Sequence, residues 1–521
     1  MTDTASVPRS IGDRSDYRPS HLREAPALGW RLVMAGGLIA GLVFRIWVLV
    51  SPMRVLDSDE AVVGLMAKSA AHGHFTTFFW GQAYGGTLEA LLAAPIVRLM
   101  PTTVVGLKLV PLVLNAVAAV LIWRIGCWIF DRRSAALAAV LFWMWPSAYI
   151  WWATKARGFY EALLVCGLLV ILVALRLAAR PASKLDWFWF GLAGGVGWWQ
   201  SPQIIFFAIP AVAWLAVALW RAGNARALRN AWTAVVSTLI GAAPWIAFNI
   251  RNPLLSLRSD FAQKQGGYVD HLRVFVREGF AMVTGSRVIY EDRWLGGSAG
   301  KVAFAIAVAL IAGGLVRALR PRRRAFLVAI ATLAFPFLLS IFPNSFYVGE
   351  GRYLMFLAPF VALLIAAIAS RYTLAAVAVV AAAAVLTASG MVAQRNITSP
   401  FAGGKHVPVE VGPVVAALEA RDIHAVWADY WISYRIRYQS DDRVAAASTG
   451  LVRDAAGQAR VSSAARSAWV FVRGAIDLDD FTCALELGHI AFERLEVRNF
   501  SVVVPERVVN PGDVSLCLGR K

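Results

Sequence analysis

Three carboxylates crowd into residues 57–60, Asp-Ser-Asp-Glu, immediately after the first long apolar segment. Like charges at this spacing repel one another, so the group is typical of a general base, a metal ligand or a partner for a cation. A structural explanation is equally open. An acidic turn can end one helix and start the next, with Ser58 or Asp59 as the N-cap of the second.

Cationic side chains recur in other polar segments that adjoin apolar runs. Lys155 and Arg157 suit a phosphate or pyrophosphate headgroup, because arginine supplies a planar fork of donors and lysine a point charge. Ordinary snorkelling at the membrane surface explains either residue alone. Glu350 and Arg352 are a further charged pair, with a local ion pair as the alternative interpretation. Other polar candidates in such segments are Tyr84, Glu89, Tyr160, Arg293 and Tyr347.

Metal binding is a weaker interpretation of the acidic group. His72 and His74 lie nearby in the sequence, but residues two apart project to different faces of a helix. Residues 57–59 match the Asp-x-Asp motif of soluble nucleotide-sugar transferases, yet that motif belongs after a strand of an α/β domain. Phosphate-loop, zinc and dinucleotide motifs do not occur in credible settings, which disfavours ATP-driven transport.

The elements that must position these residues are membrane helices. The chain has 521 residues, 59% of them hydrophobic and 16% charged, whereas soluble domains have roughly 45–50% and about 25%. A water-soluble fold is therefore excluded. The net charge of +19 resides largely in short arginine tracts between apolar runs, as in cytoplasmic loops. The lipid bilayer, rather than nucleic acid, is the expected partner of this charge.

About eleven segments are apolar over the length that a membrane helix needs. Basic tracts follow alternate segments, so those connections and the N-terminus are predicted to face the cytoplasm. The loops at 51–102, 152–157, 250–300 and 343–353 then face the outside. The predicted spans lie near residues 30–50, 103–126, 134–151, 158–178, 186–200, 203–220, 231–249, 301–318, 325–342, 354–370 and 373–392.

Three regions follow from these patterns. Residues 1–28 are predicted to be a disordered cytoplasmic tail, and residues 29–392 a polytopic α-helical membrane region. Residues 393–521 have ordinary soluble composition and are predicted to form a small extracytoplasmic α/β domain, in which Cys483 and Cys517 could form a disulfide. Its expected elements are a helix near 413–420 and strands near 425–428, 468–472 and 501–504.

The membrane region resembles the GT-C superfamily of glycosyltransferases, and is similar to glycosyltransferase family 39, the bacterial protein mannosyltransferases and the aminoarabinose transferases. The most specific match is residues 59–61, Asp-Glu-Ala opening a surface helix, followed by residues 84–90, Tyr-Gly-Gly-Thr-Leu-Glu-Ala. Shorter matches are Lys155, Arg157 and Tyr160, and Arg352-Tyr353-Leu354. The span count and the additional carboxylate of Asp57 depart from the family pattern.

The resemblance implies a GT-C-like transmembrane catalytic domain in the plasma membrane. It implies transfer of a sugar from a polyprenyl-phosphate donor to an acceptor hydroxyl or amine at the extracytoplasmic face, usually with inversion. Asp59 is the expected general base, Glu60 orients it or the acceptor, and Asp57 is the reserve candidate. The expected donor-phosphate ligands are Lys155, Arg157, Arg352 and Arg293, and the expected substrate-binding residues are Tyr84, Glu89, Tyr160 and Tyr347.

Several alternatives remain at this level. A translocase for polyprenyl-linked saccharides would need the same cations without the chemistry, and an envelope scaffold would need neither. The acceptor is a protein, a glycolipid or a polysaccharide, because hydroxyl discrimination depends on pocket geometry that a sequence does not display. The resemblance implies no required cofactor, although some GT-C relatives use a divalent metal ion.

Overall fold

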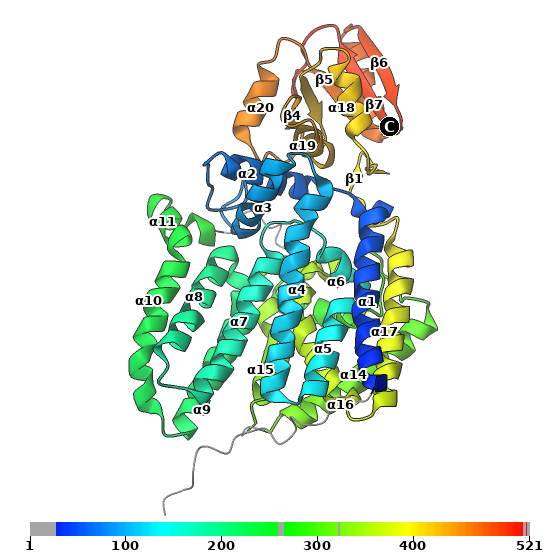
Figure 1. Ribbon diagram of the computed structural model, residues 1–521. Helices are drawn as coiled ribbons and strands as arrows, with labels where there is room; N and C mark the ends of the chain where they lie inside the picture. The colour runs from blue at the N-terminus through cyan, green and yellow to red at the C-terminus, as the bar shows by residue number, and fades with distance from the viewer. Residues whose placement is uncertain (1–27, 259–264, 321–322, 514–516, 518–521) are drawn as a thin grey trace, which may run out of the picture.

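The computed structural model describes residues 28–258, 265–320, 323–513 and Cys517. The predicted disordered tail over residues 1–28 therefore lies outside the described residues, apart from Leu28. The described chain has two layers, a helical bundle below and an α/β domain above, with α2 (Ser58–Ala71) and α3 (Leu88–Leu99) lying between them (Figure 1).

Apolar sequence and tight packing explain the bundle. Central helix α16 (Ala358–Ala369) is buried around almost its whole circumference, as expected for a helix without a polar face. The other α-helices of the bundle are α1 (Leu28–Val50), α4 (Val104–Ile129), α5 (Arg132–Met144), α6 (Ser147–Trp152), α7 (Tyr160–Ala179), α8 (Lys184–Gln200), α9 (Ile205–Arg221), α10 (Trp232–Gly241), α11 (Ala243–Arg251), α12 (Tyr268–Val274), α13 (Phe280–Val283), α14 (Ser298–Ala318), α15 (Phe326–Leu339) and α17 (Thr373–Gln394).

Each of the eleven predicted spans contains helix, but the helices differ in length. Among the described residues, six helices are long and apolar enough to cross a membrane, or seven if the bent pair 226–241 and 243–251 is one span. The other segments are shorter because the chain breaks within or beside them. The predicted span 134–151, for example, divides into α5 and α6 at Pro146, which has no backbone N–H to donate. The count of eleven therefore stays a prediction.

The upper layer is the predicted α/β domain. Its five-stranded sheet has the order β4-β3-β5-β7-β6, in which β3 pairs in parallel with β4 and β5, and β7 is antiparallel to its neighbours. A disulfide joins Cys483 to Cys517. The elements are β3 (Ala425–Ala428), β4 (Ala445–Ser448), β5 (Ala468–Val472), β6 (Phe492–Val497), β7 (Phe500–Pro505), α18 (Gly412–Glu419), α19 (Tyr430–Gln439), α20 (Ala455–Ser462), α21 (Ile476–Leu487) and the hairpin β1 (Phe401–Ala402) and β2 (Lys405–His406).

One helix of this domain docks on the membrane region. Helix α19 presents Tyr430, Tyr434 and Tyr438 at intervals of four residues, so they share one face, and all three pack into the apolar cluster of α2 and α3. Gly64 permits this contact, because a Cβ there would lie 2.4 Å from the Tyr438 ring. The upper domain is thus fixed directly over the acidic start of α2.

Candidate active site

The acidic cluster begins helix α2 with a capping box. Asp57 is the N-cap: its side chain accepts from the Glu60 N–H at 3.0 Å, and the Glu60 carboxylate accepts from the Asp57 N–H at 3.3 Å. The sequence had favoured Ser58 or Asp59 as the N-cap, and the observed cap lies one position earlier. The three carboxylates consequently point in different directions, since successive helix positions are rotated by about 100°.

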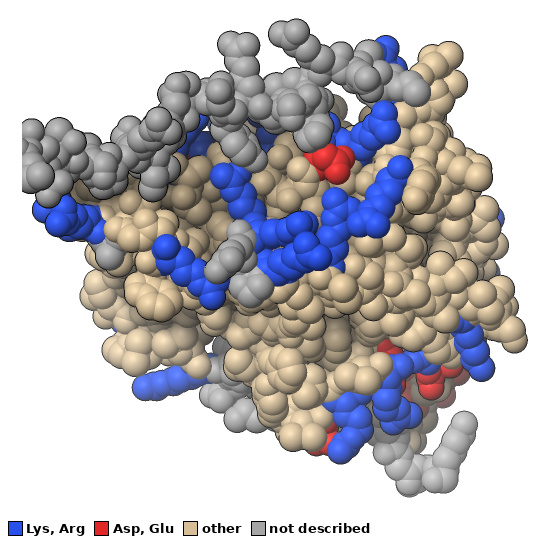
Figure 2. Space-filling view, turned by 90° about the horizontal axis from the view of Figure 1, so that it is seen from below, with Lys and Arg blue, Asp and Glu red and all other residues tan. Residues whose placement is uncertain are grey.

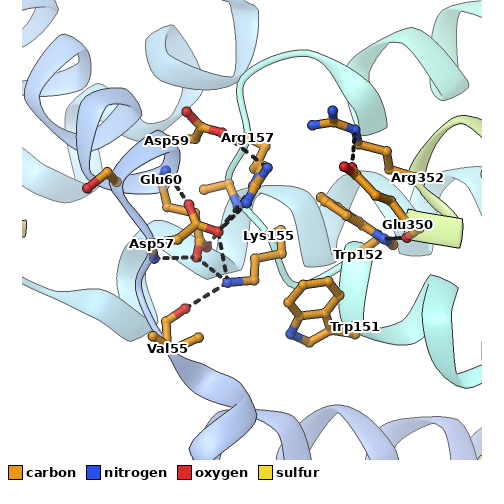
Figure 3. Close-up of polar contacts among 12 residues, drawn as sticks. Val55, Asp57, Asp59, Glu60, Trp151, Trp152, Lys155, Arg157, Glu350 and Arg352 are labelled. Carbon is orange, nitrogen blue, oxygen red and sulfur yellow. Dashed lines mark hydrogen bonds and ion pairs between the residues drawn. The ribbon is translucent and has the colours of Figure 1, made fainter. Parts of the chain in front are cut away.

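Two cations from the loop between α6 and α7 meet this helix start (Figure 3). The Arg157 guanidinium lies 2.6 Å from Asp57 Oδ2, and Lys155 Nζ lies 3.2 Å from the same oxygen. Burial opposes ionisation of Asp57, but the charges of Arg157 and Lys155 outweigh it and hold the pKa of that carboxyl well below its usual range. The two cations therefore favour the charged form of Asp57, which contacts both of them.

Glu60 points away from solvent and is fully buried. Its carboxylate lies 2.5 Å from Lys108 Nζ and 2.8 Å from Lys155 Nζ, and accepts from the Ala156 N–H at 3.1 Å. Lys155 also donates to the Val55 carbonyl at 2.7 Å. Glu60 and Lys155 therefore hold the α6–α7 loop against α2.

Asp59 is the carboxylate that faces open space. Its side chain is 18% exposed, and Oδ2 lies 3.1 Å from the Arg157 guanidinium. The other oxygen accepts from the Tyr430 hydroxyl, and the Arg453 guanidinium lies 3.7 Å from it. Asp59 thus receives contacts from the membrane region on one side and from the upper domain on the other.

Arg352 forms a second cationic group beside the cluster (Figure 3). Its Nε lies 2.7 Å from the Glu350 carboxylate, as the alternative ion-pair interpretation predicted, while the backbone carbonyl of Glu350 accepts from the Trp152 indole at 2.7 Å. The guanidinium lies 4.6 Å from the Tyr353 ring centroid. These contacts fix the orientation of the Arg352 guanidinium.

A cavity of about 1290 Å³ opens between the two layers. Both acidic and cationic candidates line it, together with residues of the upper domain. The polar residues that line it include Asp57, Asp59, Tyr84, Arg157, Tyr160, Glu350, Arg352, Tyr430 and Arg453.

The predicted site residues therefore fall into two groups. Asp57, Asp59, Tyr84, Arg157, Tyr160 and Arg352 are brought together around the cavity. The remaining candidates are not among its lining residues: Glu60, Lys155 and Glu89 are buried, Arg293 pairs with Glu291, and Tyr347 packs beside Phe346.

Solved structures of other proteins share the arrangement of the described helices. The structure of ArnT from Cupriavidus metallidurans bound to undecaprenyl phosphate matches at a TM-score of 0.61 and 13% identity, covering 92% of this chain and 98% of that one. The apo structure of ArnT matches at a TM-score of 0.58 and 15% identity, with the same coverage of both chains. The chain shares the fold of ArnT.

More distant similarity exists to the oligosaccharyltransferase AglB from Archaeoglobus fulgidus, at a TM-score of 0.47 and 12% identity, covering 84% of this chain and 69% of that one. No protein-family model and no curated protein sequence matches the chain.

Three polar residues of this candidate site escaped the sequence analysis: Lys108, Tyr430 and Arg453. Lys108 lies inside an apolar segment, where a single charge is costly unless it has a partner, and this signal was available. Tyr430 and Arg453 gave no comparable signal. They are separated from Asp59 by more than 350 positions and meet it only through the docking of α19 on α2.

A metal ion does not fit the observed donors. Within residues 28–258, 265–320 and 323–513, no three His, Cys, Asp or Glu side chains are grouped so that they could hold one. The imidazole of His72 contacts the Lys68 carbonyl instead. The oxygens of Asp57 and Asp59 already face arginine and lysine side chains, which would repel a divalent cation.

Glu89 provides a testable pH dependence. Its buried carboxylate accepts from the N–H groups of Glu161 and Ala162 at 3.0 and 3.2 Å, at the start of α7. Burial raises the pKa of Glu89 to about 7, although the N–H donors oppose the shift. Above the unfolded pKa of about 4.5, the folded protein retains a proton that the unfolded chain releases, so stability falls as pH rises towards 7.

We expect Glu89→Gln to reduce this dependence, because glutamine keeps the acceptor oxygen and has no proton to lose. Between pH 5 and pH 8, the melting temperature of Glu89→Gln in detergent should fall less than that of the wild type, by a difference of a few degrees. The exposed Glu486→Gln variant is the control. Parallel curves for all three proteins would contradict the assignment.

Proposed function

We propose that the protein is a glycosyltransferase that moves a sugar from a polyprenyl-phosphate donor to an acceptor hydroxyl or amine. The observation that carries the proposal is that a carboxylate, Asp59, and a cation, Arg352, line one cavity. A base and a leaving-group ligand must reach the same reacting centre, and the shared cavity supports this pairing. The GT-C fold, shared with an enzyme whose structure contains undecaprenyl phosphate, supports the choice of donor.

In the proposed reaction, Asp59 accepts the proton of the acceptor group as that atom attacks the anomeric carbon. The bond between the anomeric carbon and the phosphate oxygen breaks, and polyprenyl phosphate leaves with the bonding electrons. Attack opposite the leaving group inverts the anomeric configuration. Asp59 is the base because, of the three carboxylates in residues 57–60, it has the most exposed side chain and lines the cavity, whereas Glu60 is buried.

The negative charge that develops on the leaving phosphate needs fixed cations. Arg352 is the principal candidate, since its ion pair with Glu350 engages Nε and the side chain still lines the cavity. Arg157 is the second, although Asp57 and Asp59 already share its guanidinium. Lys155 acts indirectly, by holding Asp57 and Glu60 in place.

The distribution of charge supports an extracytoplasmic site. The turns that join α4 to α5, α7 to α8 and α9 to α10 lie at the lower end of the bundle (Figure 1), and Lys and Arg side chains gather on that lower face (Figure 2). Basic residues favour the cytoplasmic side of a membrane. The cavity and the upper domain lie at the opposite end, which places the reaction outside in this proposal.

A reconstituted assay tests the function directly. Purified protein in lipid nanodiscs is incubated with an extract of polyprenyl-phosphate sugars and envelope acceptors from the source cell, and products are identified by mass spectrometry. Transfer should yield free polyprenyl phosphate and a glycosylated acceptor in equal amounts. Movement of intact donor across the bilayer of proteoliposomes, without either product, would instead indicate a translocase.

Replacement of the phosphate ligand should affect donor use. We expect Arg352→Gln to raise the KM for the lipid donor about 10- to 100-fold, because a charge-assisted hydrogen bond to phosphate contributes about 1.5–3 kcal/mol. Arg352→Lys should recover part of the loss, since it retains the charge without the fork. An unchanged donor KM in both variants would remove Arg352 from the proposed phosphate site.

A further inference from the structure

The segments that follow two neighbouring parallel strands of the upper domain place polar side chains beside the acidic start of α2. Strand β3 ends at Ala428, and Asp429 caps helix α19, which begins with Tyr430. Strand β4 pairs beside β3 in parallel and ends at Ser448, and the loop that follows it carries Arg453. Because carboxyl ends of parallel strands share one edge of a sheet, Tyr430 and Arg453 meet there.

Both side chains contact Asp59. The Tyr430 hydroxyl donates to Asp59 Oδ1, and Arg453 Nε donates to the Tyr430 hydroxyl at 3.3 Å. A second nitrogen of Arg453 lies 3.7 Å from the same carboxylate oxygen, and a third donates to Gln82 at 2.8 Å. The contacts form a chain from the guanidinium through the phenol to the carboxylate.

We infer that Tyr430 and Arg453 are positioning residues for Asp59, so that the upper domain forms part of the active site rather than an appendage to it. This inference rests on the proposed function. Its content is that one oxygen of the base is held from above by Tyr430 and Arg453, while the other is held from below by Arg157 at 3.1 Å. The carboxylate then presents a fixed orientation to the acceptor.

The phenol suits this role because it remains a donor. Burial raises the pKa of Tyr430, and the negative charge of Asp59 raises it further, so the hydroxyl keeps its proton throughout the physiological range. A hydrogen bond donated to a carboxylate favours its charged form. Each carboxylate oxygen has two acceptor sites, so the contacts with Tyr430 and Arg157 leave capacity for the acceptor proton.

The test is the pH profile of kcat/KM for sugar transfer. The titratable and charged groups that face Asp59 are Arg157, Tyr430 and Arg453, with Tyr84 and Asp57 nearby. We expect Tyr430→Phe to move the acidic limb upward by about one pH unit, because the charged base loses a donor, and to lower kcat about tenfold.

Tyr438→Phe is the matched control. Tyr438 lies two turns further along the same helix, and its hydroxyl donates to the Thr103 carbonyl at 3.0 Å, away from the cavity. Both variants remove one interfacial hydroxyl and keep the aromatic ring that packs against α2 and α3. Tyr438→Phe should leave the acidic limb where it is in the wild type.

Arg453→Gln supplies an independent variant. It should move the limb in the same direction as Tyr430→Phe, and the double variant should move it by less than the sum, because the two residues act through one chain of contacts. If wild-type protein transfers sugar and the limb is the same in all these variants, the inference is wrong and the proposed function stands. If wild-type protein transfers none, the proposed function itself fails.

Discussion

Asp59→Asn should lower the kcat of sugar transfer about 10²- to 10⁴-fold, the range that general base catalysis contributes. Asparagine has nearly the same shape, so the Tyr430 hydroxyl retains an acceptor oxygen and the docking of α19 persists. Arg157 keeps its contact with Asp57 at 2.6 Å, and Arg453 keeps its hydrogen bonds to Gln82 and to the Tyr430 hydroxyl. The substitution should therefore slow the chemical step, which lowers kcat, while the donor KM changes little.

Two measurements make this result decisive. The melting temperature and the elution volume of Asp59→Asn in detergent should match those of the wild type, which separates lost chemistry from lost folding. Glu410→Gln is the control acid: Glu410 pairs with Arg54 at the domain interface, away from the lining of the cavity, and its removal should leave transfer intact. Full transfer by a correctly folded Asp59→Asn protein would exclude Asp59 as the base.

The start of α2 illustrates what the sequence could predict. A membrane fold, a C-terminal α/β domain and the proximity of residues 57–60 to Arg157 follow from composition and periodicity together with a family resemblance. The resemblance contributed the candidate base, and the structure adds that Asp59 is the most exposed of the three carboxylates. Exposure depends on where the helix starts, and shifting the N-cap by one residue redirects every carboxylate.

The contribution of the upper domain could not be predicted in the same way. Tyr430 and Arg453 lie in a region of ordinary soluble composition and are 23 positions apart, so nothing in the sequence links one to the other. Their role depends on strand order, since β3 and β4 must be parallel neighbours, and on the small size of Gly64, which lets α19 approach α2. Neither property has a local sequence signature.

Glu60→Ala should lower the free energy of unfolding by about 3–5 kcal/mol, which is the usual effect of removing one partner of a buried ion pair. Lys108 and Lys155 would lose their shared carboxylate at 2.5 and 2.8 Å. The Ala156 N–H would lose its acceptor as well, and with it the α6–α7 loop would lose its main attachment to α2. Low yield from the membrane and a melting temperature many degrees below wild type are expected.

A compensating variant separates the structural role from a chemical one. Glu60→Leu combined with Lys108→Met removes both partners of the Glu60–Lys108 ion pair. Apolar groups of similar volume replace them, a change that often restores stability. Lys155 would still contact Asp57 at 3.2 Å and the Val55 carbonyl at 2.7 Å. The double variant should therefore regain most of the melting temperature and, because Asp59 and Arg352 are untouched, measurable transfer. A stable double variant with no transfer would instead return Glu60 to the role that the sequence implied, as a partner of the base in the reaction itself.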